Sequence, residues 1–287
     1  HSLRTIGNIT KNIDPSEDDI LKLLLEMNLT LNQLKRSLVK SSGQGHLPGL
    51  GIKKSLDPII QLYLKPIRQS EDDVKERMVS GLKDLIALTP PKILDKYIID
   101  ISGTLIRIFN ERKPEDLKET IFRTINLLLD TRCKSLRISI TQLQTTYVKG
   151  ISDSSRSVRD IAGLGLEKLL KHGVRLDFLI KELLRLLNSS DVPAQLSILT
   201  ALRTMLTNFD PKVIKKFPKE QLIMDLQNSL FEFIYTEDIE ISTVSAFTLG
   251  PFTKLLPEDQ YDNLIDRLLV TEEVETIQYG LIMGTYS

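Results

Sequence analysis

The chain has 287 residues, of which 41% are hydrophobic and 26% are charged, and its formal net charge at pH 7 is zero. These fractions exclude a disordered or collagen-like chain, and the zero net charge gives by itself no reason to expect a nucleic-acid binder. Tryptophan is absent and aromatic residues make up only 6%, so leucine, isoleucine and valine must build the core, which suits helices that pack on helices.

The N-terminal part, residues 1–55, is predicted to form a helical segment followed by a glycine-rich loop. A capping pattern opens an apolar-periodic stretch at 16–40, which forms either one long helix or two shorter ones. The stretch 41–55 contains four glycines and one proline. It differs from a phosphate-binding loop because Ile52 separates the last glycine from the lysines and no strand precedes it, so we interpret it as a mobile surface loop.

From residue 56 to residue 287, helical patterns recur at a regular spacing. Each repeat consists of an apolar helix, a short polar turn and a second helix with an acidic start. Second helices are predicted to begin at steps of 43, 40, 35 and 47 residues, near Val74, Leu117, Ser157, Val192 and Ile239. This period is typical of HEAT and armadillo repeats. The predicted fold is therefore an all-α superhelix, a HEAT-type solenoid of about six helical hairpins that is truncated within a helical pattern at its C-terminus.

The first helices of the hairpins are predicted at 56–68, 93–109, 138–151, 176–187, 220–235 and 260–270. Acidic residues before the second helices are interpreted as caps, because they face exposed N–H groups and the positive end of the helix dipole. In the second helix near Ser157, an apolar stripe that includes Leu164 is wide enough to face neighbours on two sides. His172 followed by Gly173 is the pattern of a helix end.

The charges are distributed unevenly along the array. Between Gly103 and Arg175 there are 14 Lys and Arg residues against 8 Asp and Glu, whereas from Thr236 to Ser287 there are 2 against 10. Such a chain would meet an acidic partner at its middle and a basic one at its end, or it would have two differently solvated faces.

No arrangement of residues predicts catalysis, a metal site or a cofactor. The three histidines lie far apart, Cys133 is the only cysteine, and neither a Gly-x-Ser-x-Gly nor a His-Glu-x-x-His motif occurs. Paired carboxylates such as Asp72 and Asp73 fall at helix starts, where capping explains them better than acid–base chemistry. The chain is therefore predicted to be a protein-binding scaffold, not an enzyme, with no small-molecule substrate.

The cysteine count and the hydropathy pattern favour a cytoplasmic protein. A lone thiol forms no intrachain disulfide, which favours a reducing, cytoplasmic setting. No stretch of 18 apolar residues and no signal peptide is found, so no membrane partner is predicted.

The sharpest local motif runs from Ser152 to Arg159 and opens a helix. In HEAT repeats, an Asp before the second helix and an Arg inside it commonly form a ladder between neighbouring repeats, which predicts a structural role for Arg159. Arg156 lies on the turn and is freer to reach a partner.

Three runs of residues, 101–107, 142–149 with 153–159, and 249–259, are similar to the patterns "ITGPLIRI", "PQLQTTFxKALxDxxxxVR" and "LGxLxxxLxxEE". These patterns belong to the general control non-derepressible 1 family, which the chain therefore resembles. Members of this family are ribosome-associated activators of the kinase that phosphorylates translation initiation factor 2 on its alpha subunit. The resemblance covers roughly residues 94–287, and its specific part is the Gln-Leu-Gln-Thr-Thr run at 142–146.

The resemblance implies that the chain is the segment that binds the RWD domain of that kinase and holds the kinase near the ribosome. It implies partner-binding roles for Arg107, Ser139 and Ser152, to which we add Arg156 from its place on the turn. An arginine suits this role because it binds a carboxylate through two parallel hydrogen bonds. The chain departs from the family pattern at Thr104, where the family has a proline, and around Ser139, where its two prolines are missing.

Other functions stay open at this point. The chain would also suit a HEAT scaffold of another assembly, such as a transport receptor, with Arg107 as an ordinary solvated arginine. Alternatively, its basic middle would bind RNA or the ribosome directly, with a second basic patch at Lys212, Lys215, Lys216 and Lys219. Steep salt dependence without selectivity for a protein sequence would identify RNA binding.

Overall fold

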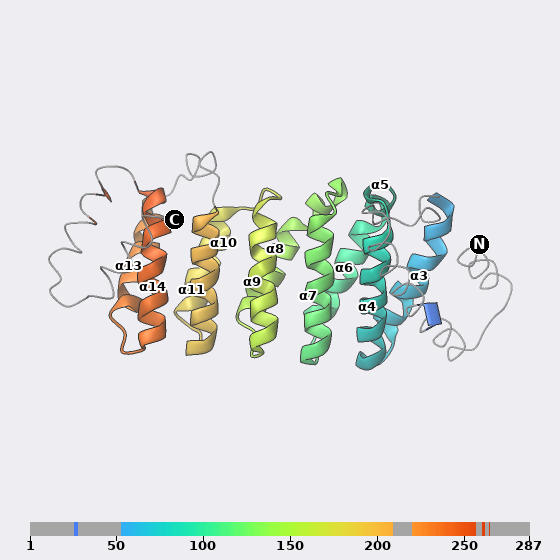
Figure 1. The fold of residues 1–287 in the computed structure, drawn as a ribbon, viewed down its shortest axis with the longest axis horizontal. Coiled ribbons are helices and arrows are strands. Elements are labelled where there is room, and N and C mark those ends of the chain that lie inside the picture. The colour runs from blue at the N-terminus through green and yellow to red at the C-terminus, as the bar shows by residue number, and fades with distance from the viewer. Residues whose placement is uncertain (1–25, 28–52, 209–219, 257–259, 262–263, 265–287) are drawn as a thin grey trace, which may run out of the picture. The chain divides into compact units, whose positions relative to one another are not determined.

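The structure is a computed structural model that describes residues 26–27, 53–208, 220–256, 260–261 and 264. These residues form α-helices and short 3₁₀ helices and no β-strand (Figure 1). The chain divides into two compact units, residues 1–146 and 147–287. The predicted N-terminal helix and glycine-rich loop lie outside the described residues, except for a helical Glu26 and Met27 and the last three loop residues. The boundary at residue 55 stays a prediction.

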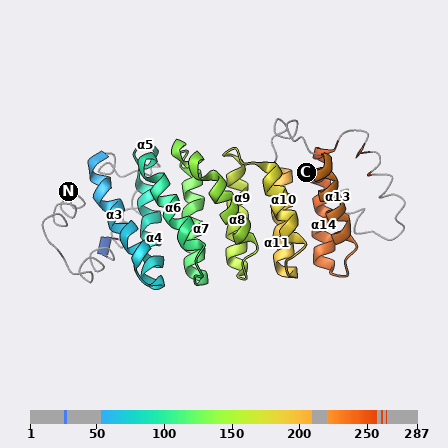
Figure 2. The same cartoon turned by 180° about the vertical axis from the view of Figure 1, so that it is seen from behind.

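Unit 1 consists of two layers of helices. In chain order its elements are α3 (Lys53–Gln69), α4 (Asp72–Leu88), α5 (Pro91–Leu94), η2 (Asp95–Tyr97), α6 (Ile98–Phe109), α7 (Glu115–Asp130), η3 (Lys134–Ser139) and the first part of α8 (Ile140–Ile151). First helices pack on first helices, α3 on α6, and second helices on second helices, α4 on α7 (Figures 1 and 2). Each hairpin thus buries its apolar faces against its neighbour as well as within itself.

Unit 2 repeats this arrangement. It contains the end of α8, α9 (Arg156–Leu170), α10 (Leu176–Leu187), α11 (Val192–Thr207), α13 (Glu220–Ile234), α14 (Ile239–Phe252) and η4 (Thr253–Leu255). The second helices α9, α11 and α14 pack side by side (Figure 1), and α10 packs on α13 in the other layer.

The predicted helices are confirmed over the described part of the chain. All five second helices begin within two residues of the predicted positions. The stretch 93–109, predicted as one helix, is α5, η2 and α6 in succession. Helical backbone angles at Leu94, Asp95 and Ile98 make this a tightened turn and not a break. Most of the sixth predicted first helix, 260–270, lies outside the described residues.

The predicted acidic caps are confirmed at two of the second helices. The carboxylate of Asp191 accepts a hydrogen bond from the Ala194 N–H at 3.1 Å, and Asp238 accepts one from the Ile241 N–H at 3.0 Å. Each side chain satisfies one of the N–H groups that lack a partner within the helix.

At the other three second helices this prediction is wrong in detail. Ser155, and not Asp153, accepts the hydrogen bond from the Val158 N–H that caps α9. Glu71 before α4 and Pro114 before α7 make no capping hydrogen bond through a side chain. At α4 and α7 the acidic residues lie in the first turn, where they act on the helix dipole.

Two further predictions concern α9. Gly173, just after the helix, has a φ of 76°, the left-handed conformation that favours glycine at a helix end. Leu164, predicted to belong to the buried stripe, is instead 60% exposed. It lies two residues from the buried Ala162 and Leu166, so it points about 200° around the helix from each of them.

Candidate partner-binding surface

A shallow hollow of about 530 Å³ lies along one face of α6 in unit 1. Among the residues that line it are Arg68, Ile99, Asp100, Gly103, Thr104 and Arg107. Those of α6 recur every three or four positions, so they share one face of the helix. We call this feature the α6 hollow.

The floor of the α6 hollow is open at Gly103. A Cβ atom added at this position would meet no other atom within 4 Å. One turn before it, Ile99 is 47% exposed, and one turn after it lies Arg107. The hollow therefore presents an apolar side chain, an empty floor and a guanidinium in line along the helix.

Arg107, like Lys96, is an exposed cation that lines this hollow. Within the described ranges it has no hydrogen-bond or ion-pair partner. It lies in the last turn of α6, where a positive charge faces the negative end of the helix dipole. Its guanidinium is thus available for a carboxylate from outside the chain.

The second arginine of the hollow, Arg68, is already bound within the chain. It forms an ion pair with Asp100, and its Nη2 and Nε donate to the Thr104 hydroxyl at 2.9 and 3.2 Å. These contacts join the end of α3 to α6. Asp100 is thus occupied by Arg68. Glu111, the other carboxylate of the hollow, pairs with Lys113 at 3.1 Å, so Arg107 is left without a counter-ion in the hollow.

Ser139, predicted from the family resemblance to contact a partner, is buried at 4% exposure. Its Oγ lies 2.8 Å from that of Ser102, whose own hydroxyl donates to the Ile99 carbonyl at 3.3 Å. The two hydroxyls form a buried hydrogen bond with each other. Ser139 therefore joins η3 to α6, and the neighbouring Ile138 is the exposed side chain at this position.

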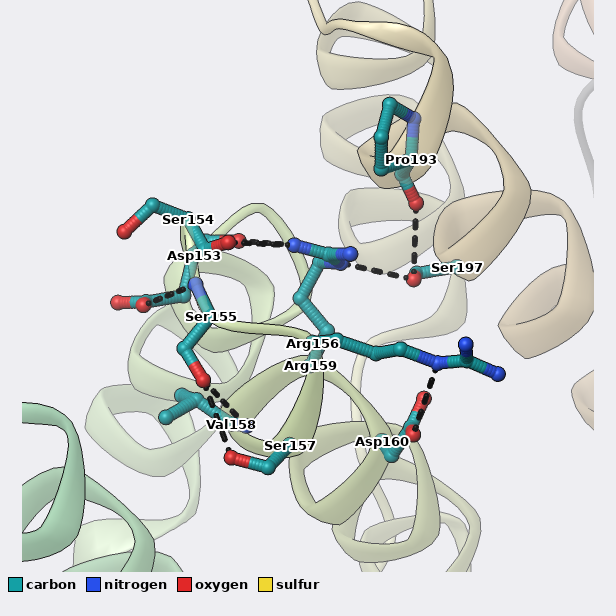
Figure 3. A network of polar contacts seen from close by, with 10 residues as sticks. All are labelled: Asp153, Ser154, Ser155, Arg156, Ser157, Val158, Arg159, Asp160, Pro193 and Ser197. Atoms are coloured by element: carbon teal, nitrogen blue, oxygen red, sulfur yellow. Dashed lines mark hydrogen bonds and ion pairs between the residues drawn. The ribbon is translucent and has the colours of Figure 1, made fainter.

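Ser152 and Arg156 lie in unit 2, Ser152 on the turn before α9 and Arg156, which was predicted to lie on this turn, at the first position of the helix. Ser152 is half-buried and donates to the Lys149 carbonyl at 3.2 Å. The Arg156 side chain is 88% exposed, and its Nε lies 3.8 Å from a carboxylate oxygen of Asp160 (Figure 3). Of the two, Arg156 is the one that extends into solvent.

The predicted structural role of Arg159 is confirmed. The residue is 6% exposed, and its Nη1 donates to the carbonyls of Asp153 and Ser154 at 2.8 and 3.0 Å. Its Nε donates to the Ser197 hydroxyl on α11 at 3.0 Å (Figure 3). The ladder between repeats thus uses carbonyl and hydroxyl oxygens, while the Asp153 carboxylate accepts from the Ser155 N–H.

Sequence reasoning missed the roles of Gly103 and Ile99. The available signal was their spacing, because Ile99, Gly103 and Arg107 follow one another at intervals of four on a predicted helix. The ion pair of Arg68 could not be predicted from a local sequence pattern, since its partner Asp100 lies 32 positions further along the chain.

The α6 hollow offers hydrogen-bond donors and apolar contact. In the part of the chain that the structure describes, no group of three His, Cys, Asp or Glu side chains is arranged to hold a metal ion. Burial raises the pKa of the Cys133 thiol, which keeps it protonated.

No helix within the described ranges has the length and apolar character needed to cross a membrane.

No protein-family model matches the chain. It is 29% identical over 266 residues to Protein ILITYHIA of Arabidopsis thaliana and 27% identical over 269 residues to the stalled ribosome sensor GCN1 of Homo sapiens. These alignments cover 92% and 93% of this chain and 10% of each relative. The eIF-2-alpha kinase activator GCN1 of Dictyostelium discoideum is 27% identical over 210 residues, 72% of this chain and 8% of that protein. The chain spans about a tenth of the length of the curated relatives it matches.

Solved structures share the fold. A chain from a structure described as the structural basis of microtubule plus end tracking by XMAP215, CLIP-170 and EB1 superposes with a TM-score of 0.62 at 12% identity. The match covers 78% of this chain and 88% of that one. At this identity the likeness is one of fold alone, and it confirms the predicted HEAT/armadillo-type array of helical hairpins.

Proposed function

The chain corresponds to a region of the GCN1 family, and we propose that it is a helical-repeat scaffold in translational control that binds an RWD domain. The RWD domain is that of the kinase that phosphorylates initiation factor 2 alpha, and binding promotes the activation of this kinase on cytoplasmic ribosomes. Relatives named as an eIF-2-alpha kinase activator and a stalled ribosome sensor support the proposal. The ribosome would be contacted through the full-length protein.

The observation that carries the proposal is the exposed, unpaired Arg107 at the edge of the α6 hollow. A partner carboxylate would bind its guanidinium in a two-pronged ion pair. A partner apolar side chain would pack against Ile99 over the open floor at Gly103. Arginine is among the residue types that supply most of the binding energy at protein interfaces.

The test is a binding titration of the RWD domain against the chain and its Arg107→Ala variant. We expect the variant to bind at least about ten-fold more weakly, roughly 1.4 kcal/mol, because an interfacial carboxylate loses its partner. The matched control is Arg123→Ala, which removes another exposed helix arginine, one already paired with Glu119 at 3.3 Å. Circular dichroism of both variants checks that each is folded.

A steric variant gives independent support. Gly103→Met would place a side chain in the hollow, where an added Cβ atom meets no other atom within 4 Å, and would improve the helix propensity of α6. We expect it to block RWD binding while the chain stays at least as stable. If the wild-type chain does not bind the RWD domain, the docking proposal is wrong and only the helical-repeat scaffold stands. If Arg107→Ala binds as well as wild type, the RWD domain binds elsewhere.

A second candidate function is direct binding of RNA or the ribosome. It is favoured by the basic surplus between Gly103 and Arg175 and by the exposed guanidiniums of Arg107 and Arg156. The predicted lysine patch from Lys212 to Lys219 lies outside the described residues. RNA binding would weaken steeply with salt and would respond equally to Arg107→Ala and Arg123→Ala, whereas RWD binding would respond to Arg107 alone.

A further inference from the structure

Unit 2 contains a second recess, on the face formed by its second helices. It has a volume of about 680 Å³ and lies between α9 and α11, with the start of α14 at its edge. Among its lining residues are Gly163, Leu164, Glu167, Val192, Ser197 and Glu240. We call it the α9–α11 groove.

The floor of the α9–α11 groove is made of small residues. A Cβ atom at Gly163 would meet nothing within 4 Å, and Ser197 and Ala201 line the groove from α11. Arg159 binds Ser197 and two backbone carbonyls in the same region, which fixes α9 against α11. The groove is thus open to a side chain at Gly163, and the two helices that form it are held together by Arg159.

The walls of the groove carry apolar side chains that no part of the described chain covers. Leu164 of α9 is 60% exposed and Val192 of α11 is 43% exposed. Both line the same recess. Large apolar side chains gathered in one exposed recess are typical of a binding surface, whereas single ones scattered over a surface are not.

Three carboxylates and two arginines line the groove, and two of the carboxylates have no cationic partner among the described residues. Asp160, Glu167 and Glu240 line it, against one exposed cation, Arg156, which lies 3.8 Å from Asp160. Arg159 is buried and its donors are already bound to oxygen atoms. Glu167 accepts only a long bond of 3.5 Å from the neutral Asn208, and Glu240 has no ion-pair partner within the described ranges. Glu167 and Glu240 are therefore available to pair with cations from a partner.

We propose that the α9–α11 groove binds a segment of a partner protein that carries Lys or Arg side chains next to apolar ones. An apolar side chain of the segment lies over Gly163, between Leu164 and Val192. The neighbouring cations pair with Glu167 and Glu240. This site is distinct from the α6 hollow in charge and in place, so the inference goes beyond the proposed RWD docking and stands without it.

The test uses fluorescein-labelled peptides and fluorescence anisotropy with the 287-residue chain. The probe is an eight-residue peptide of alternating leucine and arginine, with Leu–Glu and Ser–Arg repeats of the same length as controls. We expect the Leu–Arg peptide to bind at least about ten-fold more tightly than either control, because only it supplies both cations and apolar groups.

The variant that tests the site is Gly163→Met, which places a side chain in the empty floor. We expect it to weaken binding of the Leu–Arg peptide at least about ten-fold while the thermal midpoint stays the same or rises, since methionine forms helix better than glycine. Gly103→Met is the matched control, because it makes the same change on the open floor of the α6 hollow. It is expected to leave peptide binding unchanged.

Several outcomes would overturn the proposal. They are a Leu–Arg peptide that does not bind, a Leu–Glu or Ser–Arg peptide that binds equally well, and equal effects of Gly163→Met and Gly103→Met. Should Gly163→Met fail to fold, Glu240→Gln replaces it, because this exposed carboxylate makes no hydrogen bond or ion pair in the described part of the chain. Unchanged affinity in Glu240→Gln would then refute the assigned charge pairing.

Discussion

The two recesses, the α6 hollow in unit 1 and the α9–α11 groove in unit 2, are built alike but differ in charge. Each contains one arginine that is bound within the chain and one that is exposed. In the α6 hollow these are Arg68 and Arg107. In the α9–α11 groove they are Arg159 and Arg156.

The difference lies in what the internal arginine binds. Arg68 forms its ion pair with Asp100, which removes a carboxylate from the α6 hollow and leaves Arg107 as a free positive charge. Arg159 binds carbonyl and hydroxyl oxygens, so the carboxylates of the α9–α11 groove stay available. The partner of the structural arginine therefore decides which charged groups of each recess stay without a counter-ion.

The sharpest test of this comparison separates Arg159 from Arg156, three residues apart. Arg159→Ala is expected to lower the free energy of unfolding by about 2 to 4 kcal/mol, because Arg159 is buried and the carbonyls of Asp153 and Ser154 and the Ser197 hydroxyl lose a charged donor. Arg156→Ala should cost about 0.5 kcal/mol or less, since the pair with Asp160 is exposed. Urea unfolding followed by circular dichroism measures both. Similar losses in the two variants would contradict the assignment of roles.

A smaller loss of stability is expected when the uncharged hydrogen bond between Ser139 of η3 and Ser102 of α6 is removed. Ser139→Ala should lower the free energy of unfolding by about 1 kcal/mol, because the buried hydrogen bond between Ser102 and Ser139 is lost. RWD binding should change less than about two-fold, since the side chain is buried. Ser152→Ala is the control, as its hydroxyl makes one local bond at the end of α8. A loss of RWD affinity in a stable Ser139→Ala variant would show that this serine acts at the surface.

The smallest effect concerns an ion pair that joins neighbouring hairpins of unit 1. Lys113 donates to Asp72 at 2.8 Å and pairs with Glu111 at 3.1 Å. The hydrogen bond from Lys113 holds the pKa of Asp72 below its ordinary value of 3.8. Because the folded-state pKa is lowered, the pair stabilises the fold at pH values above the ordinary value, and this contribution is lost as the pH falls through the folded-state pKa.

Asp72→Asn measures this contribution. The variant should be less stable than wild type by about 1 kcal/mol or less at pH 7, and the difference should shrink as the pH is lowered below about 3.8, where wild-type Asp72 itself becomes protonated. Asp73→Asn is the control for the shared effect on the dipole of α4, because Asp73 is exposed and has no ion-pair partner among the described residues. A stability difference that does not vary with pH would rule out the pair as its source.

The order and positions of the helices followed from the sequence, because periodicity and turn chemistry are local properties. The 35- to 47-residue recurrence of second helices and the left-handed Gly173 required no knowledge of neighbouring repeats. Part of the candidate surface was accessible in the same way. Arg107 came from a resemblance carried by contiguous residues, and the separation of Arg156 from Arg159 came from their predicted places on a turn and in a helix.

The surfaces themselves depend on how the repeats stack. Arg68 meets Asp100 across 32 positions, Ser102 meets Ser139 across 37, and Arg159 meets Ser197 across 38. Which residue pairs with which, and hence the burial of Ser139 and the free charge of Arg107, follows from the register between hairpins. No local pattern encodes that register, because it results from packing many side chains of neighbouring repeats together at once.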